Sequence, residues 1–260
     1  MEKVKYTIIT VCYNAEKYIR ETIESLLCQT YMDYEYIIKD GGSTDKTLEI
    51  AHSLLDGKEN IYIVSNPDKG IYDAMNQAVE MARGEYVYFL NAGDCFVNQN
   101  VLANVEVISS KRKSDILYGN IVQVEEKQRV IYKYGKVCKS KLYFSIGACI
   151  CHQAMFVKRK LFDEKNFDTT YKVCADREWQ LYQMKKKVVF TPMNFEVASV
   201  LVDGFSSVHV KELEEEIVEC LEQYCTGTSW IYKTILKIKK NKLILRMLRT
   251  IEKIVSIKKQ

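Results

Sequence analysis

Residues 4–40 read VKYTIITVCYNAEKYIRETIESLLCQTYMDYEYIIKD and contain one strand–helix–strand unit. The β-branched run at 4–13 predicts a buried strand. Apolar residues recur at helical spacing within 16–30, which predicts an amphipathic helix. The apolar run at 34–40 predicts a second buried strand. Because parallel neighbours in a sheet are usually connected by a helix, this stretch favours an α/β fold.

The same alternation continues toward the middle of the chain. The sequence predicts a helix reaching about Leu55, a strand at 60–66, a helix at 70–84 that ends at Gly84, and a strand at 85–91. Strand and helix thus alternate four times within about ninety residues, which predicts a doubly wound, mostly parallel sheet. In such a sheet, ligands bind at the carboxyl ends of the strands.

The pattern is less regular after Asp94. We expect a hairpin or two mixed-sheet strands at 115–126 and 128–136, and a further strand at 152–159. A helix at 175–187, an extended segment at 188–202 and an acidic helix at 210–224 should follow. From residue 230 onward the sequence predicts a basic helix or helical hairpin. The second half therefore predicts a small mixed sheet followed by a C-terminal helical tail.

Length and composition narrow the class of protein. At 260 residues the chain suits one large α/β domain or two small ones, and its 47% hydrophobic and 28% charged content is typical of a globular protein. It has no apolar run of about 18 residues and no signal-peptide pattern, so we expect no membrane-spanning helix and a cytoplasmic location. Its nine cysteines form no CxxC pair, which argues against a zinc ribbon and suits buried thiols in a reducing compartment.

The segment 231–260 is strongly basic. It carries ten Lys and Arg residues against one acid, Glu252, whereas the other 230 residues carry 28 basic and 33 acidic side chains. Its apolar residues recur at helical spacing, so residues 230–260 predict a basic amphipathic helix that binds an anionic membrane surface. The alternative is that this helix packs on its own domain or on a second subunit of a homodimer. No nucleic-acid-binding motif accompanies the charge, so we expect no nucleic-acid partner.

Polar residues gather where the predicted strands end. The four strand ends carry Tyr13-Asn14, Asp40-Gly41-Gly42, Asn66-Pro67-Asp68 and Asn91-Ala92-Gly93-Asp94. These residues should share one edge of the sheet, and that edge is the expected site. Neither GxxxxGK[ST] nor G-x-G-x-x-G occurs, so a phosphate-bearing ligand would need another source of positive charge. A divalent cation held by the acidic residues is the natural candidate.

Two long segments resemble family 2 glycosyltransferases, a group with the GT-A nucleotide-sugar fold. They are ITVCYNAEKYIRETIESLLCQTYMDYEYIIKDGGSTDKT and NPDKGIYDAMNQAVEMARGEYVYFLNAGD, and their motifs follow the family's order. Together with HQAMF, these motifs look closest to bacterial members that assemble exopolysaccharide or surface glycans. The resemblance implies a nucleotide-sugar-binding half at 1–97, an acceptor-binding half of the same domain at 98–209, and a C-terminal helical extension at 210–260.

The resemblance also implies where the nucleoside binds. Its floor would be formed by Thr10, Val11, Tyr13 and Asn14. Tyr13 would either stack near the base or be a partly buried aromatic residue at the strand end. Asp40 would accept a hydrogen bond from N3–H of uracil or thymine; the alternative is a turn-forming aspartate.

The sugar diphosphate would lie near Asp68 and Lys69. Lys69 either meets phosphate charge or is an ordinary solvated lysine. His152 and Gln153 would line the donor or acceptor sugar pocket, although a lone histidine can equally be structural.

Asp94 is implied to be the metal ligand for Mn²⁺ or Mg²⁺, at the end of the family's D-x-D-like motif. This chain has Asn91 where relatives often carry the first aspartate, so one carboxylate remains and metal binding without nucleotide should be weaker. Asn91, Ala92 and Gly93 would contact the substrate, with Asn91 bonding the ribose or orienting a water molecule.

The resemblance places the catalytic base in CADREW, at Asp176. An inverting transfer needs a carboxylate that takes the proton of the acceptor hydroxyl. Glu178 is the reserve candidate, and either residue could instead only charge the start of a helix.

These features predict a metal-dependent, inverting glycosyltransferase. It would move a sugar from a nucleoside-diphosphate sugar, taken as a UDP-sugar, to a glycan or lipid-linked saccharide in bacterial polysaccharide or surface-glycan biosynthesis. A lipid-linked acceptor would suit an enzyme at the inner face of the cytoplasmic membrane. One alternative is a glycan- or nucleotide-binding protein that has lost catalysis, which Asn91 keeps open. A nucleotidyltransferase is less well supported, because YNAEKYIRE lacks a glycine-rich loop.

Overall fold

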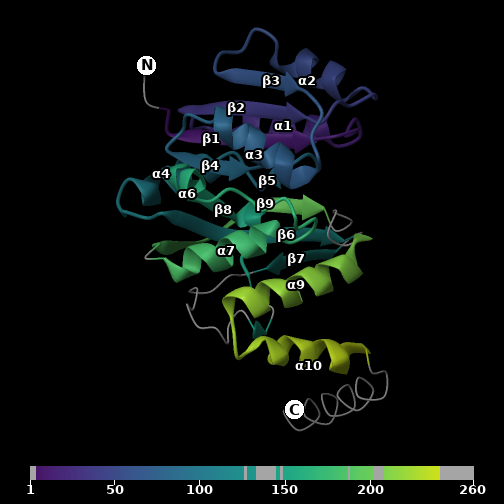
Figure 1. The fold of residues 1–260 in the computed structure, drawn as a ribbon. Coiled ribbons are helices and arrows are strands. Elements are labelled where there is room, and N and C mark those ends of the chain that lie inside the picture. The colour runs from purple at the N-terminus through teal and green to yellow at the C-terminus, as the bar shows by residue number, and fades with distance from the viewer. Residues whose placement is uncertain are drawn as a thin grey trace, which may run out of the picture.

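The computed structural model describes residues 4–125, 128–132, 145–146, 149–186, 188–201 and 208–240. One nine-stranded mixed sheet lies between two layers of helices (Figure 1). Its strand order is β3-β2-β1-β4-β8-β6-β9-β5, and β7 pairs with β6 outside this path. The predicted α/β fold is confirmed.

The first half is the parallel part of the sheet. Its elements are β1 (Tyr6–Cys12), α1 (Ile19–Leu27), β2 (Tyr34–Asp40), α2 (Thr47–Leu55), β3 (Ile61–Ser65), α3 (Ile71–Met81) and β4 (Tyr86–Phe89). Strand β1 pairs in parallel with β2 and β4, and β2 with β3. In the strand register, Cys12 of β1 is the partner of Asp40 in β2, and Asp40 is the partner of Ser65 in β3. The loops after these strands therefore meet at one edge, as expected.

The second half is mixed. Its elements are β5 (Cys95–Phe96), α4 (Val101–Ser109), β6 (Ile116–Glu125), β7 (Gln128–Tyr132), the 3₁₀ turn η1 (His152–Ala154), β8 (Met155–Lys158), α6 (Lys160–Glu164), α7 (Ala175–Lys185), β9 (Phe190–Leu201), α9 (Val210–Tyr224) and α10 (Ser229–Lys240). Strand β8 is antiparallel to both β4 and β6, whereas β6 and β9 are parallel. Strands β6 and β7 form the predicted hairpin.

Local expectations were wrong at four places. Helices α4 and α6 and the short strand β5 lie in segments for which no such element was predicted. Helix α3 ends at Met81, so Gly84 does not terminate it. A Cβ at Gly84 would lie 2.5 Å from the backbone nitrogen of Thr7, so glycine is needed there for close packing of the loop before β4 against β1.

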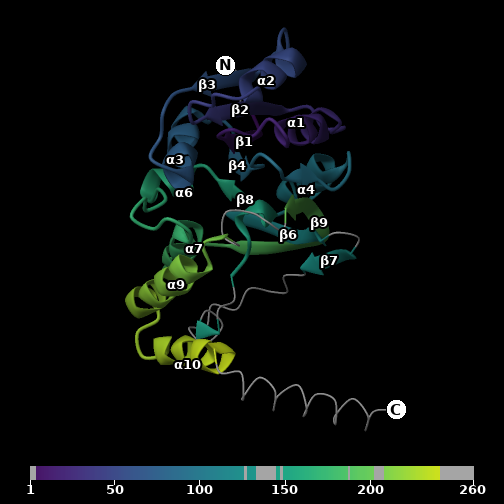
Figure 2. The same cartoon turned by 90° about the vertical axis from the view of Figure 1, so that its right-hand side faces the viewer.

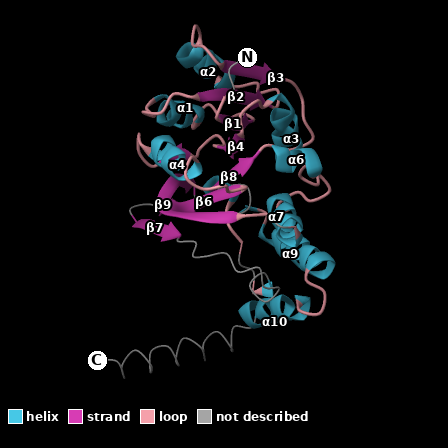
Figure 3. Ribbon diagram, turned by 90° about the vertical axis from the view of Figure 1, so that its left-hand side faces the viewer, coloured by secondary structure: helices cyan, strands magenta, loops and turns pink. Residues whose placement is uncertain are grey.

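The sheet separates two apolar cores, because alternate strand residues face opposite sides. On one face, Ile9 and Val11 of β1 share a core with residues of α3, α7, α9 and α10. On the other face, Tyr6 and Ile8 share a core with residues of α1, α2 and α4. Figure 3 shows the two helical layers on either side of the sheet.

The C-terminal helices extend the first of these layers (Figure 2). Tyr232 and Leu236 of α10 are buried in the same core as Ile217 and Leu221 of α9. The part of the basic segment that forms α10 therefore packs on its own domain, and predictions for 241–260 lie outside the described residues. None of the helices in the described part of the chain is long and apolar enough to cross a membrane.

Candidate active site

The loops after β1 and β2 are joined by side-chain-to-backbone hydrogen bonds. Asn14 has a left-handed φ of 49°. Its side-chain Oδ1 accepts a hydrogen bond from the backbone N–H of Thr44 (2.9 Å), and its backbone N–H donates to Oγ of Ser43 (2.8 Å). Asp45 accepts a bond from the amide of Glu16 (3.0 Å). Asn14 is thus a loop-closing residue, and these bonds present Tyr13 at the edge with 65% of its surface exposed.

Thr10 and Val11 lie below this surface. The hydroxyl of Thr10 is fully buried and donates to the carbonyl oxygen of Leu90 (2.6 Å). Val11 is a core residue whose carbonyl oxygen accepts a bond from the amide of Ala92 (3.3 Å). Both residues support the predicted nucleoside floor from inside the sheet.

The carboxylate of Asp40 is fully buried and accepts several hydrogen bonds. Its Oδ2 accepts from the amides of Gly42 and Ser43 (both 2.9 Å) and from the hydroxyl of Ser65 (2.7 Å), and its Oδ1 accepts from the hydroxyl of Ser43. Burial raises the pKa of Asp40, but these hydrogen bonds outweigh burial and leave the pKa below its usual value. Asp40 is therefore an ionised anchor of this loop, and its Oδ1 also accepts a bond from the thiol of Cys12 (3.7 Å).

A buried lysine that sequence reasoning did not single out lies beside Asp40. The Nζ of Lys39 donates to the carbonyl oxygens of Asn66 (2.7 Å) and Asp40 (3.0 Å), and it lies 3.3 Å from Oδ2 of Asp68. A Cβ at Gly41 would lie 2.7 Å from that Oδ2 and 3.4 Å from the Tyr13 ring. Glycine there lets Asp68 and Tyr13 approach the end of β2, as the predicted nucleoside site requires. The single lysine within the apolar run of β2 was the available clue.

Lys69 is exposed, and its amide donates to Oδ2 of Asp73 (2.8 Å) at the start of α3. Its role toward phosphate stays a prediction.

The turn after β4 carries Asn91 and Asp94, both buried. It is closed by a bond from the amide of Asp94 to the carbonyl oxygen of Asn91 (2.9 Å). Gly93 has a φ of 102°, and a Cβ there would lie 2.5 Å from Leu201. Burial raises the pKa of the Asp94 carboxyl to about 7, opposed by the neighbouring His152 and by hydrogen bonds from Gln153 and the backbone at Leu201.

His152 and Gln153 contact the two polar residues of this turn. The Nε2 of His152 lies 3.2 Å from Nδ2 of Asn91, and the side chain of Gln153 hydrogen-bonds to Asp94. The segment is held under β4 because the hydroxyl of Tyr88 donates to the carbonyl oxygen of Gln153 (2.6 Å). These two residues therefore hold the turn, a role that the sequence did not indicate.

Asp176 lies in the first turn of α7, next to His152. Its Oδ1 accepts a bond from the hydroxyl of Tyr72 (3.1 Å), and its Oδ2 lies 3.3 Å from Nδ1 of His152. Burial raises the pKa of Asp176, but the hydrogen bonds from His152 and Tyr72 and the charge of Arg177 outweigh burial and lower it. Asp176 is thus held ionised next to the turn.

Glu178 belongs to a different environment. It is buried, lies 3.2 Å from Nζ of Lys165, and accepts a hydrogen bond from the hydroxyl of Tyr224 on α9. These contacts hold α7 against its neighbours, so the geometry favours Asp176 over Glu178 as the base.

The 91–94 turn has oxygen atoms that suit a hard cation. Among the residues that the structure describes, Oδ1 of Asn91 is buried without a hydrogen-bond partner, and the carboxylate of Asp94 is close in sequence on the same turn. Mg²⁺ and Mn²⁺ need few protein oxygens when substrate phosphates and waters complete the shell. Within the described ranges, no three His, Cys, Asp or Glu side chains form a metal centre by themselves. The residues therefore fit a cation that is bound together with a diphosphate.

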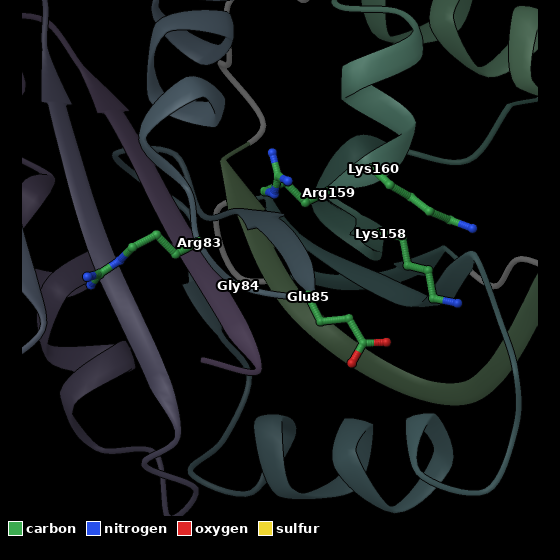
Figure 4. Close-up of a pocket in the computed structure, with 6 residues that line it drawn as sticks. All are labelled: Arg83, Gly84, Glu85, Lys158, Arg159 and Lys160. Atoms are coloured by element: carbon green, nitrogen blue, oxygen red, sulfur yellow. The ribbon is translucent and has the colours of Figure 1, made fainter. Parts of the chain in front are cut away.

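A pocket of about 330 Å³ lies at the opposite edge of the sheet (Figure 4). It is lined by Arg83, Gly84, Glu85, Lys158, Arg159 and Lys160. Each cation has a carboxylate partner: Arg83 pairs with Glu35, Lys158 and Lys160 with Asp115, and Arg159 with Asp163. This pocket contains none of the predicted site residues, and all four of its cations are engaged in ion pairs, two of them with the same carboxylate.

Comparison with known proteins agrees with this geometry. The family model described as Glycosyl transferase family 2 matches residues 7–164. The chain is 32% identical over 180 residues to a PGL/p-HBAD biosynthesis glycosyltransferase of Mycobacterium bovis (strain BCG / Pasteur 1173P2), and the match covers 68% of each chain.

Two solved structures share the fold. One is S. aureus TarS 1–349 in complex with UDP-GlcNAc, with a TM-score of 0.67, 18% identity, and coverage of 87% of this chain and 69% of that one. The other is a mannosyltransferase from Pyrobaculum calidifontis in complex with GDP-Man and Mn²⁺, with a TM-score of 0.66, 15% identity, and coverage of 99% and 81%.

Proposed function

This chain belongs to glycosyl transferase family 2, and on that premise we propose that it transfers a sugar from a nucleoside-diphosphate sugar to a hydroxyl group, with inversion at the anomeric carbon. The observation that carries the proposal is that Asp176, an ionised carboxylate, lies one histidine side chain away from the 91–94 turn. A direct displacement needs a base close to the turn that would bind the diphosphate.

The donor is a UDP-sugar in this proposal. Tyr13 offers an exposed ring beside Gly41, and Asp40, buried at the end of β2, would exchange one of its loop hydrogen bonds for a bond from the base. Uracil presents N3–H to such an acceptor, whereas cytosine has no hydrogen at N3. The UDP-GlcNAc complex of the structural neighbour TarS is consistent with this donor class.

A Mn²⁺ or Mg²⁺ ion would be held by Asp94 with the unpaired Oδ1 of Asn91 beside it. When bound, the ion would offset the negative charge of the departing nucleoside diphosphate. Gln153 and His152 keep these two side chains in place on their turn.

Asp176 acts as the general base in this proposal. Its carboxylate takes the proton of the acceptor hydroxyl while that oxygen forms a bond to the anomeric carbon. The bond from the same carbon to the diphosphate breaks, and the nucleoside diphosphate leaves. The lowered pKa of Asp176 keeps it ionised at neutral pH, so it can accept this proton without prior deprotonation.

The acceptor is a glycan or a lipid-linked saccharide of bacterial surface-glycan or polysaccharide biosynthesis. The basic segment 241–260 supports a lipid-linked acceptor at the cytoplasmic face of a membrane.

A screen of nucleotide sugars with Mn²⁺ tests the proposal. We expect a UDP-sugar to raise the melting temperature and to be hydrolysed slowly, with GDP- and CDP-sugars giving smaller effects. Tight binding without turnover in the presence of candidate acceptors would favour a nucleotide-sugar-binding protein instead. If no nucleotide sugar binds, the transferase proposal is wrong.

A further inference from the structure

Four elements that are distant in the sequence meet at His152. Asn91 follows β4, His152 begins η1, Asp176 begins α7, and Tyr72 lies in α3. The contacts run in series from Asn91 through His152 to Asp176 and Tyr72, with separations of 3.2, 3.3 and 3.1 Å. The side chains of His152 and Asp176 retain 15% and 17% exposure, so this chain of contacts reaches the open edge of the site.

The hydrogen-bond pattern assigns the tautomer of His152. With the Asn91 amide oriented so that Nδ2 faces the ring, Nε2 is the acceptor of this contact. The single proton of a neutral imidazole then lies on Nδ1, which donates to Oδ2 of Asp176. Each ring nitrogen thus has one defined partner, one on the turn and the other at the base.

Building on the proposed function, we infer that His152 is a positioning residue that sets the separation between the 91–94 turn and the general base Asp176. The acceptor oxygen must fit between the carboxylate of Asp176 and an anomeric carbon whose diphosphate lies at the turn. An error of about 1 Å in this span costs on the order of 100-fold in rate. One rigid ring that contacts both sides fixes the span more closely than two independently mobile side chains.

The surroundings of His152 hold the ring in place from both ends. The side chain of Gln153, the next residue, hydrogen-bonds to Asp94. Its backbone carbonyl oxygen accepts a hydrogen bond from the hydroxyl of Tyr88. The single hydroxyl proton of Tyr72 is shared between the other oxygen of Asp176 (3.1 Å) and the carbonyl oxygen of Val173 (2.8 Å). A histidine that only filled space would not need a separate polar partner at each nitrogen.

Two amide substitutions separate the two contacts. In His152→Asn, the amide nitrogen falls near the position of Nδ1 and can still donate to Asp176, but the contact with Asn91 is lost. In His152→Gln, the amide group falls near Nε2 and can still meet Asn91, but the contact with Asp176 is lost. His152→Ala removes both contacts, and the pair of amide variants controls for folding because each keeps one native bond.

The measurements are kcat with a UDP-sugar and the affinity for UDP with Mn²⁺. Because the span depends on both contacts, we expect each amide variant to lose about 100-fold in kcat, whereas only His152→Asn, which releases Asn91 on the turn, should also lose about tenfold in affinity. His152→Ala should lose at least as much in both quantities. If either amide variant keeps the wild-type kcat, the inference is wrong while the proposed function stands. A wild-type protein that turns over no nucleotide sugar overturns both.

Discussion

The Nδ1 atom of His152 lies 3.3 Å from Oδ2 of Asp176, and the same ring reaches Asn91 through Nε2. This relationship joins the start of α7 to the turn after β4, two places that no local pattern connects. It makes the proposed base and the turn parts of one hydrogen-bonded unit. The predictions below test the members of that unit and the loops around it.

Asp176→Asn should reduce kcat by about 100- to 10,000-fold, because an amide cannot take the acceptor proton. The affinity for UDP should be unchanged, since Asp176 lies outside the predicted nucleoside pocket. Initial rates and calorimetric titration measure the two effects. Asp163→Asn is the matched control, because Asp163 is exposed and pairs with Arg159 at the surface of α6. Equal turnover in Asp176→Asn and wild type would remove Asp176 as the base.

Tyr72→Phe should lower kcat about tenfold, since one oxygen of Asp176 loses its donor while the bond from His152 remains. The donor KM should change little, because Tyr72 contacts the base and the carbonyl oxygen of Val173. Steady-state kinetics with varied donor separate these parameters. A raised donor KM at constant kcat would show that Tyr72 serves the donor pocket instead.

Asp94→Asn should abolish most of the stabilisation that UDP and Mn²⁺ together confer, because the turn would lose its only carboxylate. We expect the apparent Mn²⁺ affinity in the presence of UDP to fall by about tenfold or more. Thermal-shift titrations of Mn²⁺ at fixed UDP measure it, with the exposed Asp56→Asn as control. Unchanged Mn²⁺ dependence in Asp94→Asn would exclude Asp94 as the main ligand.

Asp40→Asn should destabilise the fold at neutral pH by roughly 1–3 kcal/mol, because Asp40 anchors its loop with a buried carboxylate. The pKa of Asp40 is lowered in the folded state, so its stabilisation is present above the unfolded pKa of about 4 and is lost as pH falls through the folded pKa. Urea unfolding from pH 7 to pH 3 should therefore show the difference from wild type shrinking with acid. A difference that grows on acidification would contradict this assignment.

A chain that ends after Lys240 should stay folded, because Tyr232 and Leu236 of α10 remain to complete the core. It loses six Lys and Arg residues and Glu252, a net change of five positive charges. If 241–260 bind an anionic bilayer, flotation with anionic vesicles should fall sharply, since each such cation contributes about 1 kcal/mol at the surface. Neutral vesicles and high salt are the controls. Equal flotation of both chains would remove the membrane interpretation.

Much of the fold could be predicted because its evidence is local. Up to Asn91, the spacing of apolar residues indicates whether each segment is a strand or a helix. The observed strands of this part fall within the predicted ranges. The helix end at Gly84 was wrong because that glycine is required by packing against Thr7, a contact across the sheet. Helix α4 was missed because its apolar residues do not form a clear one-sided stripe.

For the site too, some features follow from the local sequence and others depend on tertiary packing. The sequence by itself determined that Asp40, Asp68 and Asp94 belong to one edge, since parallel strands connected by helices bring their carboxyl ends together. It could not determine that Lys39 is buried beneath Asp68, or that His152 lies between Asn91 and Asp176. The first contact depends on how the loop after β3 folds over the end of β2. The contacts of His152 depend on the antiparallel insertion of β8 between β4 and β6 and on the packing of α7 beside α3. Such pairings are selected by burial and hydrogen bonding across the whole domain, and no period within the chain encodes them.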